Sequence, residues 1–360
     1  MLAKIYSGAT QGIDAYLVEV EIHSEANLPS ITMVGLPDSA VKESRERVTA
    51  AIKNNGIDFP KRKITINLAP ADIKKEGSSF DLPIAIGILA SNEIVVSELL
   101  KDSIILGELS LDGSLREIKG ALPISVSAKQ MGFKRILLPE DSAPEASIVD
   151  GIDVIALKSL KQTIDYLSGR LQIPPYYTDK NELFNKINKY HLDFQDVKGQ
   201  ENVKRALEIA AAGGHNILMI GPPGSGKTML AKRLPSILPP LSFEEALETT
   251  KIHSVAGILP KNTALITERP FRSPHHTVSD AALIGGGSYP KPGEVSFAHH
   301  GVLFLDELPE FKKNVLEVLR QPLEDSKVTV SRSKMSLEFP ANFMLAAAMN
   351  PCPCGYYTDP

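Results

Sequence analysis

The chain has 360 residues and a formal net charge of −4 at pH 7, and 43% of its residues are hydrophobic. This length predicts two domains, each large enough to bury its own core. The small negative charge excludes a protein that coats nucleic acid through overall positive charge, although it allows a local basic surface. Because the sequence has no apolar signal segment and no apolar run long enough to span a membrane, we expect a cytoplasmic protein.

The pattern of apolar residues over residues 1–168 predicts one α+β domain, with strands and helices that follow no regular order. The strands are expected at residues 31–34, 63–68, 135–138 and 154–157, with a hairpin from residue 104 through the turn at Asp112-Gly113. The helices are expected after Pro37-Asp38 and at residues 80–91, 121–131 and 159–167. Residues 169–193 contain Pro174-Pro175, two tyrosines and many charges, so they are the expected linker.

Residues 194–360 change to a regular alternation of helix and strand, which predicts an α/β domain with a parallel sheet. A helix is expected at residues 201–212, and buried strands at 217–220, 302–305 and 343–348. Polar residues follow these strands directly, and the carboxyl ends of parallel strands are where an open α/β sheet binds its ligand.

An apolar strand runs directly into a glycine-rich loop and a helix at residues 215–234. The loop has the spacing G-x-x-x-x-G-K-T, which in this context is typical of a phosphate-binding P-loop. Glycine lets backbone N–H groups approach phosphate oxygens, the lysine reaches the β- and γ-phosphates, and the threonine hydroxyl binds Mg²⁺. The chain is therefore predicted to bind a nucleoside triphosphate. The residues expected to contact it here are Gly221, Pro222, Pro223, Gly224, Ser225, Gly226, Lys227 and Thr228.

The segment GVLFLDE, residues 301–307, supplies the second half of an ATPase site. Four apolar residues form a strand, after which Asp306 is placed to hold Mg²⁺ and Glu307 to polarise the attacking water. Asn350 ends a third strand and could orient water or the γ-phosphate. The alternative for Asn350 is an Asx-turn before Pro351.

Four long blocks of the sequence carry a resemblance to a known family: DVKGQENVKRALEIAAAGGHNILMIGPPGSGKT, FRSPHHTVSDAALIGGGSYPKPGEVSFAHHGVLFLDELPEF, VLEVLRQPLED and FPANFMLAAAMNPCPCGYY. The chain resembles the YifB/ComM family of magnesium-chelatase-like AAA+ ATPases. The resemblance implies a Lon-protease-like (ribosomal-protein-like) N-terminal domain followed by an AAA+ core. It also implies Lys227 and Thr228 as Walker A, Asp306 and Glu307 as Walker B, and Asn350 as sensor 1. Val197 and Gly199, in the loop 194–200, would border the adenine.

Two segments resemble the loops that line the central pore of the family's rings. The long stretch between Thr228 and Asp306 resembles an insertion in helix 2, and residues 327–339 alternate apolar and polar residues, as a β-hairpin does. Arg332 and Lys334 lie near the expected tip of this hairpin and could follow a phosphate backbone. The alternative is an ordinary solvated hairpin.

Paired histidines and cysteines raise the question of a metal. No acidic or cysteine partner lies at a ligand spacing from His275-His276 or His299-His300, so hydrogen-bonding and core roles are favoured. Cys352 and Cys354 supply only half of a Cys₄ zinc site. The family resemblance implies further cysteines beyond residue 360, so a structural Zn²⁺ is a possibility for the full-length protein.

The N-terminal domain also allows a test for protease activity, because Lon-type proteases use a Ser-Lys dyad. The loop KEGSSFD places Ser79 near the nucleophile position, but Arg116 stands at the position of the base. A guanidinium stays protonated and cannot accept the proton, and Lys119 would need a shifted geometry. Proteolysis is therefore not expected, and Ser79 is expected to be a helix N-cap.

The function that the resemblance implies is an ATP-driven ring motor that acts on single-stranded or branched DNA, of the helicase or branch-migration type. Three alternatives are a chelatase-like motor that remodels a protein partner, an ATP-dependent protease and a non-motor ATP-binding scaffold. In the family, the helical lid with sensor 2 and the arginine finger follow the point at which this sequence ends, so both are expected beyond Pro360. Arg320 is the first candidate for an arginine finger within the chain.

Overall fold

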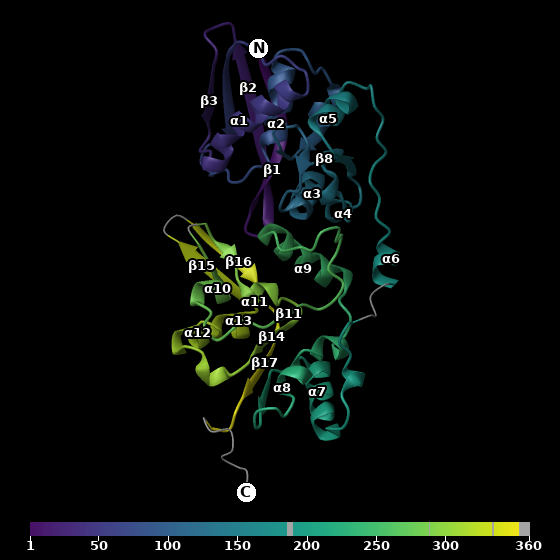
Figure 1. The fold of residues 1–360 in the computed structure, drawn as a ribbon, viewed down its shortest axis with the longest axis vertical. Helices are drawn as coiled ribbons and strands as arrows, with labels where there is room; N and C mark the ends of the chain where they lie inside the picture. The colour runs from purple at the N-terminus through teal and green to yellow at the C-terminus, as the bar shows by residue number, and fades with distance from the viewer. Residues whose placement is uncertain (186–189, 288, 333–334, 353–360) are drawn as a thin grey trace. The chain divides into compact units, whose positions relative to one another are not determined.

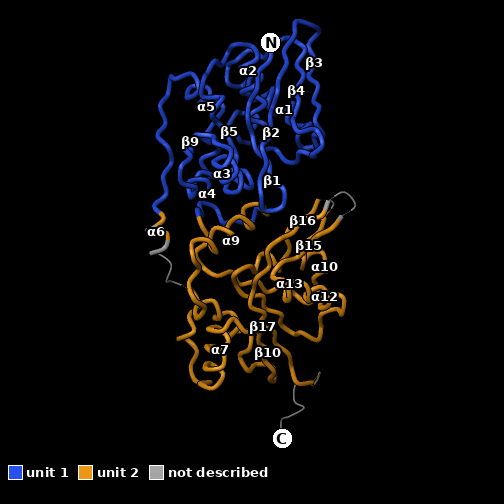
Figure 2. Tube along the Cα trace, turned by 180° about the vertical axis from the view of Figure 1, so that it is seen from behind, with its two compact units in different colours: residues 1–179, 257–264 blue, residues 180–256, 265–360 orange. Residues whose placement is uncertain are grey.

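The computed structural model describes residues 1–185, 190–287, 289–332 and 335–352. The chain divides into two compact units (Figure 2): unit 1 contains residues 1–179 and 257–264, and unit 2 contains residues 180–256 and 265–360. None of the described helices is both long and apolar enough to cross a membrane.

The sheet of unit 1 is built around two long antiparallel strands, β1 (Leu2–Gln11) and β2 (Asp14–Glu25). Alternate side chains of β2, namely Val18, Val20 and Ile22, are completely buried. Neither strand is among the elements predicted from the sequence, although the segment LVEVEIHSE in β2 alternates between apolar and polar residues, as a half-buried strand does.

Five shorter strands complete this sheet, in the order β3-β4-β2-β1-β5-β8-β9. They are β3 (Ser30–Val34), β4 (Lys63–Ala69), β5 (Ser103–Ile105), β8 (Arg135–Pro139) and β9 (Asp153–Leu157). β2 pairs antiparallel with β1 and β4, whereas the other pairings are parallel. The predicted hairpin is confirmed as β6 (Glu108–Leu109) and β7 (Leu115–Arg116).

Helices cover both faces of this sheet (Figure 1). Gly87 of α2 packs against Ile22, whereas Ile124 of α3 packs against Gly8 and belongs to the cluster that contains Leu17. Ile22 and Leu17 lie an odd number of residues apart on β2, so they face opposite sides of the sheet. The predicted helices are confirmed as α1 (Ser39–Asn54), α2 (Asp81–Ser91), α3 (Ala121–Gln130) and α5 (Leu160–Leu167), and a short α4 (Ala143–Ala146) lies between them.

The sheet of unit 2 is parallel, as the alternation of helix and strand predicts. The order of its described strands is β10-β17-β14-β11. They are β10 (Ile217–Ile220), β11 (Phe271–Arg272), β14 (Val302–Leu305) and β17 (Met344–Met349). The helix α7 (Glu201–Gly213) precedes β10, and α8 (Lys227–Ala231) follows it and contacts β17 (Figure 1).

The remaining elements of unit 2 are short, apart from one helix and one hairpin. The helices are α6 (Lys180–Asn185), α9 (Phe243–Ala256), α10 (Asp280–Ile284), α11 (Glu294–Phe297), α12 (Lys313–Glu317) and α13 (Arg320–Asp325). β12 (Gly285–Gly286) pairs with β13 (Lys291–Pro292). The predicted hairpin is confirmed as β15 (Lys327–Arg332) and β16 (Met335–Pro340), beside α13 (Figure 1).

Candidate nucleotide-binding site

Three strands of unit 2 end at the same edge of the parallel sheet and place the predicted site residues there. Gly221 follows β10, Asp306 follows β14 and Asn350 follows β17, each directly after the last residue of its strand. β17 pairs with both β10 and β14, so the three positions are neighbours. This edge is where an open α/β sheet binds its ligand.

The glycine-rich loop has the backbone conformation that its sequence predicts. Gly224 and Gly226 have φ angles of +78° and +88°, in the left-handed region where a Cβ would be strained. Gly226 is the N-cap of α8, and the N–H of Gly221 donates to the carbonyl of Met349 on β17 (3.3 Å). Pro222, Pro223 and Gly224 are exposed, whereas Ser225 is half-buried. The loop is therefore tied to the sheet at its start and open to a ligand along its length.

The ammonium group of Lys227 lies inside this loop. It donates to the carbonyl oxygens of Gly221 (2.7 Å) and Pro222 (2.9 Å), and it lies 3.3 Å from Oδ1 of Asn350. These partners are neutral, and charge-assisted bonds to anionic phosphate oxygens are roughly twice as strong as bonds between neutral groups. Lys227 is thus held at the loop by partners that phosphate oxygens can replace.

Thr228 and Asp306 bring together the two oxygen donors that the sequence assigns to Mg²⁺. The hydroxyl of Thr228 donates to Oδ2 of Asp306 across 2.6 Å, and Oδ1 of Asp306 accepts the N–H of Glu307 (3.0 Å). Thr228 is exposed and Asp306 is half-buried, so solvent reaches the pair. Mg²⁺ prefers hard oxygen ligands and keeps several of its waters. This donor set fits a partly hydrated Mg²⁺ bound together with substrate phosphates.

Glu307 adopts an unusual backbone conformation at the start of a short 3₁₀ turn, Leu308–Glu310. Its φ angle is +55°, and its side chain is 59% exposed. Oε2 of Glu307 lies 3.4 Å from Nδ1 of His276, in the segment that follows β11. The sequence provides no direct signal for this contact, because the two residues belong to different strand-end loops.

The loop at residues 194–200 contains the two residues expected to border the adenine. Val197 is only 3% exposed and packs in the core of unit 2 with Leu207 and Leu230. Gly199 has a φ angle of +70°. The side-chain amide of Gln200 donates to the carbonyl of Ser225 (3.1 Å), which links this loop to the P-loop. Gln200 is the last residue of the loop that is expected to border the adenine, and the sequence gives no signal for its bond to Ser225.

The structure gives His299 and His300 the largely buried, hydrogen-bonding roles that the sequence favours, and α9 brings Glu248, which no sequence spacing indicates, to both rings. Oε2 of Glu248 lies 3.2 Å from Nε2 of each ring. Burial, and then the neighbouring His300, lowers the pKa of His299 to about 4. Nδ1 of this neutral ring accepts the N–H of Asn342 (3.0 Å), so Nε2 carries the proton. Nε2 of His299 therefore offers no lone pair to a metal ion.

Several predicted residues fall at or beyond the limits of the described structure. The backbone of Arg332 pairs with Met335 at the end of β15, but its side chain lies outside the described residues, as does all of Lys334. Cys352 is half-buried, and Cys354 lies outside the described residues. The proposed DNA and zinc contacts of these residues stay predictions.

The expectation that Ser79 caps a helix is wrong. The N-cap of α2 is Phe80, which makes no side-chain capping bond, because α2 begins one residue later than a Ser79 cap requires. Ser79 instead accepts the N–H of Gly107 through its backbone carbonyl (2.9 Å). The guanidinium of Arg116 donates to Oγ of Ser110 (2.8 Å) and lies 3.6 Å from Glu108.

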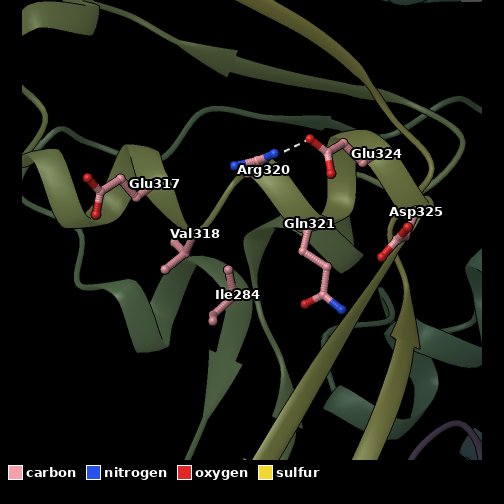
Figure 3. Close-up of a pocket in the computed structure, with 7 residues that line it drawn as sticks. All are labelled: Ile284, Glu317, Val318, Arg320, Gln321, Glu324 and Asp325. Atoms are coloured by element: carbon pink, nitrogen blue, oxygen red, sulfur yellow. Dashed lines mark hydrogen bonds and ion pairs between the residues drawn. The ribbon is translucent and has the colours of Figure 1, made fainter.

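Arg320, the candidate for an arginine finger within the chain, lies on α13 and lines a pocket of about 350 Å³ (Figure 3). Its guanidinium is directed to Glu324, with Nε 2.8 Å from Oε1. The pocket is also lined by Glu317 and Asp325. Arg320 is 81% exposed, so its surface ion pair with Glu324 contributes little stability.

Comparison with known proteins places both parts of the chain in one family. Residues 193–360 match the family described as Magnesium chelatase, subunit ChlI, and residues 18–142 match Subunit ChlI of Mg-chelatase. Competence protein ComM of Haemophilus influenzae is 46% identical over 359 residues, covering 99% of this chain and 70% of that protein. The uncharacterized protein YifB of Escherichia coli is 45% identical over 357 residues, covering 99% and 69%. Lon protease 2 of Bacillus subtilis is 33% identical over 159 residues, covering 40% and 27%.

The extent of these matches settles the family. ComM and YifB each align with nearly the whole chain at about 45% identity, so the likeness is not confined to the P-loop. Membership implies the use of ATP and Mg²⁺, for which the parallel sheet of unit 2 provides a fitting set of donors. The chain therefore belongs to the ComM/YifB family of magnesium-chelatase-like AAA+ ATPases.

Proposed function

We propose that unit 2 hydrolyses ATP at the edge where β10, β14 and β17 end. The observation that carries this proposal is the 2.6 Å contact between the Thr228 hydroxyl and the Asp306 carboxylate, beside the ammonium of Lys227. A P-loop hydroxyl and a carboxylate from a second strand are the protein ligands that P-loop ATPases give to Mg²⁺.

Each residue of this cluster has a separate task. Lys227 leaves the loop carbonyls and binds the β- and γ-phosphates, while Thr228 and Asp306 hold Mg²⁺. A Mg²⁺ ion held by Thr228 and Asp306 would supply positive charge that stabilises the charge developing on the phosphates. Glu307 accepts the proton of the attacking water. Asn350, 3.3 Å from Lys227, orients the water or the γ-phosphate.

Replacing the base separates binding from hydrolysis. In full-length protein, Glu307→Gln should bind ATP with Mg²⁺ normally and lower kcat by roughly a hundredfold or more, because an amide does not accept the proton. Glu310→Gln, three residues along the same exposed turn, is the matched control and should keep normal turnover. Normal turnover by Glu307→Gln would place the base elsewhere.

We further propose that ATP hydrolysis drives a ring of these subunits along DNA, in the manner of a helicase or branch-migration motor in the cytoplasm. The hairpin β15–β16 supports this, because Arg332 is the last residue of β15, and Lys334, which lies outside the described residues, follows it closely in the sequence. The likeness to a competence protein gives the second support. The alternative is a motor that remodels a protein partner, as the match to a magnesium chelatase subunit allows.

Stimulation of the ATPase by DNA distinguishes these two functions. For full-length protein, single-stranded or forked DNA should raise kcat, and Arg332→Ala with Lys334→Ala should remove this increase while the basal rate stays unchanged. The increase should also fall with added salt, since phosphate contacts release counterions. Lys101→Ala on the surface of unit 1 is the control. An ATPase indifferent to both DNAs would favour the protein-remodelling motor.

We infer that unit 1 is a Lon-like domain without proteolytic activity, which serves assembly or DNA contact. The likeness to Lon protease 2 supports the kinship. The partners of Arg116 support the loss of activity, because a guanidinium held by Glu108 and Ser110 supplies no base for Ser79.

A further inference from the structure

The hairpin β15–β16 is buried along one face only. Val328, Val330 and Phe339 are at most 2% exposed, whereas Thr329, between the two valines, is half-buried and Ser331 is exposed. Alternate residues of a strand point to opposite faces, so the valine face packs inward and the opposite face meets solvent. Among the described residues, β15 and β16 pair with no third strand. A two-stranded hairpin alone is marginally stable in water, so its position depends on contacts outside the hairpin.

Gln321 of α13 supplies one of these contacts, at the outer edge of β15. Its Nε2 donates to Oγ1 of Thr329 (3.2 Å), and its Oε1 accepts the backbone N–H of Thr329 (3.4 Å). In an antiparallel pair, the N–H of every second residue points away from the partner strand. The N–H of Thr329 is one of these, so the amide of Gln321 takes the place of a third strand. Gln321 is half-buried and also lines the pocket shown in Figure 3.

The buried face of the hairpin is held at the next residue, Val330. A Cβ atom on Gly285 of β12 would lie 3.1 Å from Cγ2 of Val330 and 2.3 Å from the carbonyl oxygen of Lys291. Gly285 is buried and has a φ angle of +112°, a conformation that favours glycine. The backbone of β12 therefore reaches the side chain of Val330 directly. β15 is thus held at two successive residues, at its edge by Gln321 and on its buried face by the β12–β13 hairpin.

The part of β15 that is held lies close to the proposed DNA contact. Arg332, the last residue of β15, is three residues beyond Thr329, or about 10 Å at the rise of a β-strand. A cation on a hairpin that is already held in place binds a phosphate without a further cost in ordering the chain. The two hydrogen bonds of Gln321 therefore favour the arrangement of the hairpin that a DNA contact at Arg332 requires.

We propose that Gln321 is a positioning residue for DNA-stimulated ATP hydrolysis, an inference that rests on the proposed action of the chain on DNA. Its amide fixes the edge of β15 and, through the strand, the place of Arg332. The two hydrogen bonds join α13 to β15 and do not involve the P-loop. Removal of the amide should therefore reduce the response to DNA and leave basal hydrolysis unchanged.

The test compares the ATPase of full-length variants with and without single-stranded DNA. Gln321→Ala should raise the DNA concentration that gives half-maximal stimulation by roughly tenfold, the size expected from the loss of two hydrogen bonds. Basal kcat and KM for ATP should stay within about twofold. Thr329→Val keeps the backbone N–H and should have a smaller effect, which should disappear in a Gln321→Ala background. Gln130→Ala, exposed at the end of α3 in unit 1, is the matched control.

Hydrogen exchange over residues 327–331 gives a readout that does not depend on activity. The backbone N–H of Thr329 should exchange faster in Gln321→Ala, while the protection of β14 stays unchanged. This pattern separates a local release of the hairpin from a general loss of stability in unit 2.

An unchanged response to DNA, or unchanged exchange at Thr329, in Gln321→Ala would overturn the inference. A basal kcat that falls by the same factor as the stimulated kcat would also overturn it, because Gln321 would then support unit 2 as a whole. The same holds if Thr329→Val keeps its full effect in the Gln321→Ala background. A wild type that DNA does not stimulate would instead refute the proposed action on DNA, and the inference with it, so the two failures are distinguishable.

Discussion

The two units use charged side chains in different ways. In unit 1, Asp81 is completely buried and binds the guanidinium of Arg47 through both carboxylate oxygens, at 2.7 and 3.0 Å. In unit 2, Lys227, Asp306 and Glu307 are half-buried or exposed and lie together at one edge of the sheet. A charge pair closed off from water supports the fold, whereas charges gathered where solvent reaches them can bind a ligand.

The buried pair of unit 1 joins two helices. Arg47 reaches from α1 to the start of α2, and it also donates to the carbonyl of Ala40. Asp81 accepts the N–H of Leu109 as well (3.1 Å), so its carboxylate is satisfied from two directions. By comparison, Lys227 contacts loop carbonyls and Thr228 contacts Asp306 at the sheet edge of unit 2. A nucleotide with Mg²⁺ can displace these contacts.

The largest expected effect is on stability in unit 1. Arg47→Met should lower the free energy of unfolding by about 3–5 kcal/mol, because it leaves the Asp81 carboxylate buried without its countercharge. Arg45→Met is the control on the same helix. Arg45 is exposed and paired with Glu46, and the loss of such a surface pair costs about 1 kcal/mol or less. Denaturant unfolding measures both, and equal losses would contradict the comparison.

The next effect is on binding in unit 2. Lys227→Ala should weaken ATP binding by roughly a hundredfold, about 2.7 kcal/mol, since it removes the ammonium that faces the phosphates. The fold should be nearly unaffected, because Lys227 makes its contacts with loop carbonyls and not with the core. Lys232→Ala, exposed at the end of α8, is the control. Unchanged ATP affinity by calorimetry would refute the site.

A smaller effect is expected from pH on the stability of unit 2, through His299 and its neighbours His300 and Glu248. The pKa of His299 is lowered from 6.5 to about 4 by burial and by His300, so between these values the unfolded chain binds more protons. The free energy of unfolding that depends on neutral His299 is therefore fully present above pH 6.5 and decreases as the pH falls toward 4. The expected decrease between pH 7 and pH 5 is about 2 kcal/mol. Glu248 acts in the same direction, because hydrogen bonds from His299 and His300 outweigh burial and lower its pKa.

Hydrogen exchange in α9 and β14 measures this loss, because Glu248 lies on α9 and His299 lies three residues before the start of β14. His299→Gln should flatten the pH dependence, whereas His23→Gln on the exposed surface of unit 1 should leave it unchanged. A pH dependence that survives in His299→Gln would assign it to other groups.

The sequence predicts local features well and tertiary contacts poorly. The end of β14, the P-loop glycines and the start of α1 after Asp38 each depend on neighbouring residues, and the structure agrees with these predictions. The contact of Glu307 with His276 and that of Glu248 with His299 join segments far apart in the sequence. Spacing along the chain holds no information about such pairs until the strand order is known.

The strands β1 and β2 show a different limit. The alternating pattern of β2 is present in the sequence, whereas the residues of β1, LAKIYSGATQ, do not alternate between apolar and polar. Only the strand order reveals that β1 and β2 occupy the centre of the sheet.

The smallest effect is expected at Ser79. Because unit 1 is expected to have no protease activity, replacing Ser79 should change no measured activity. The residue at the position that the resemblance gives to the base is Arg116, whose guanidinium lies 3.6 Å from Glu108 and cannot accept a proton at any working pH. Ser79→Ala should therefore leave ATP turnover and stability unchanged, and neither protein should cleave casein with or without ATP. Cleavage by the wild type that disappears in Ser79→Ala would show that unit 1 holds an active nucleophile. It would also contradict the contrast between a structural unit 1 and a ligand-binding unit 2.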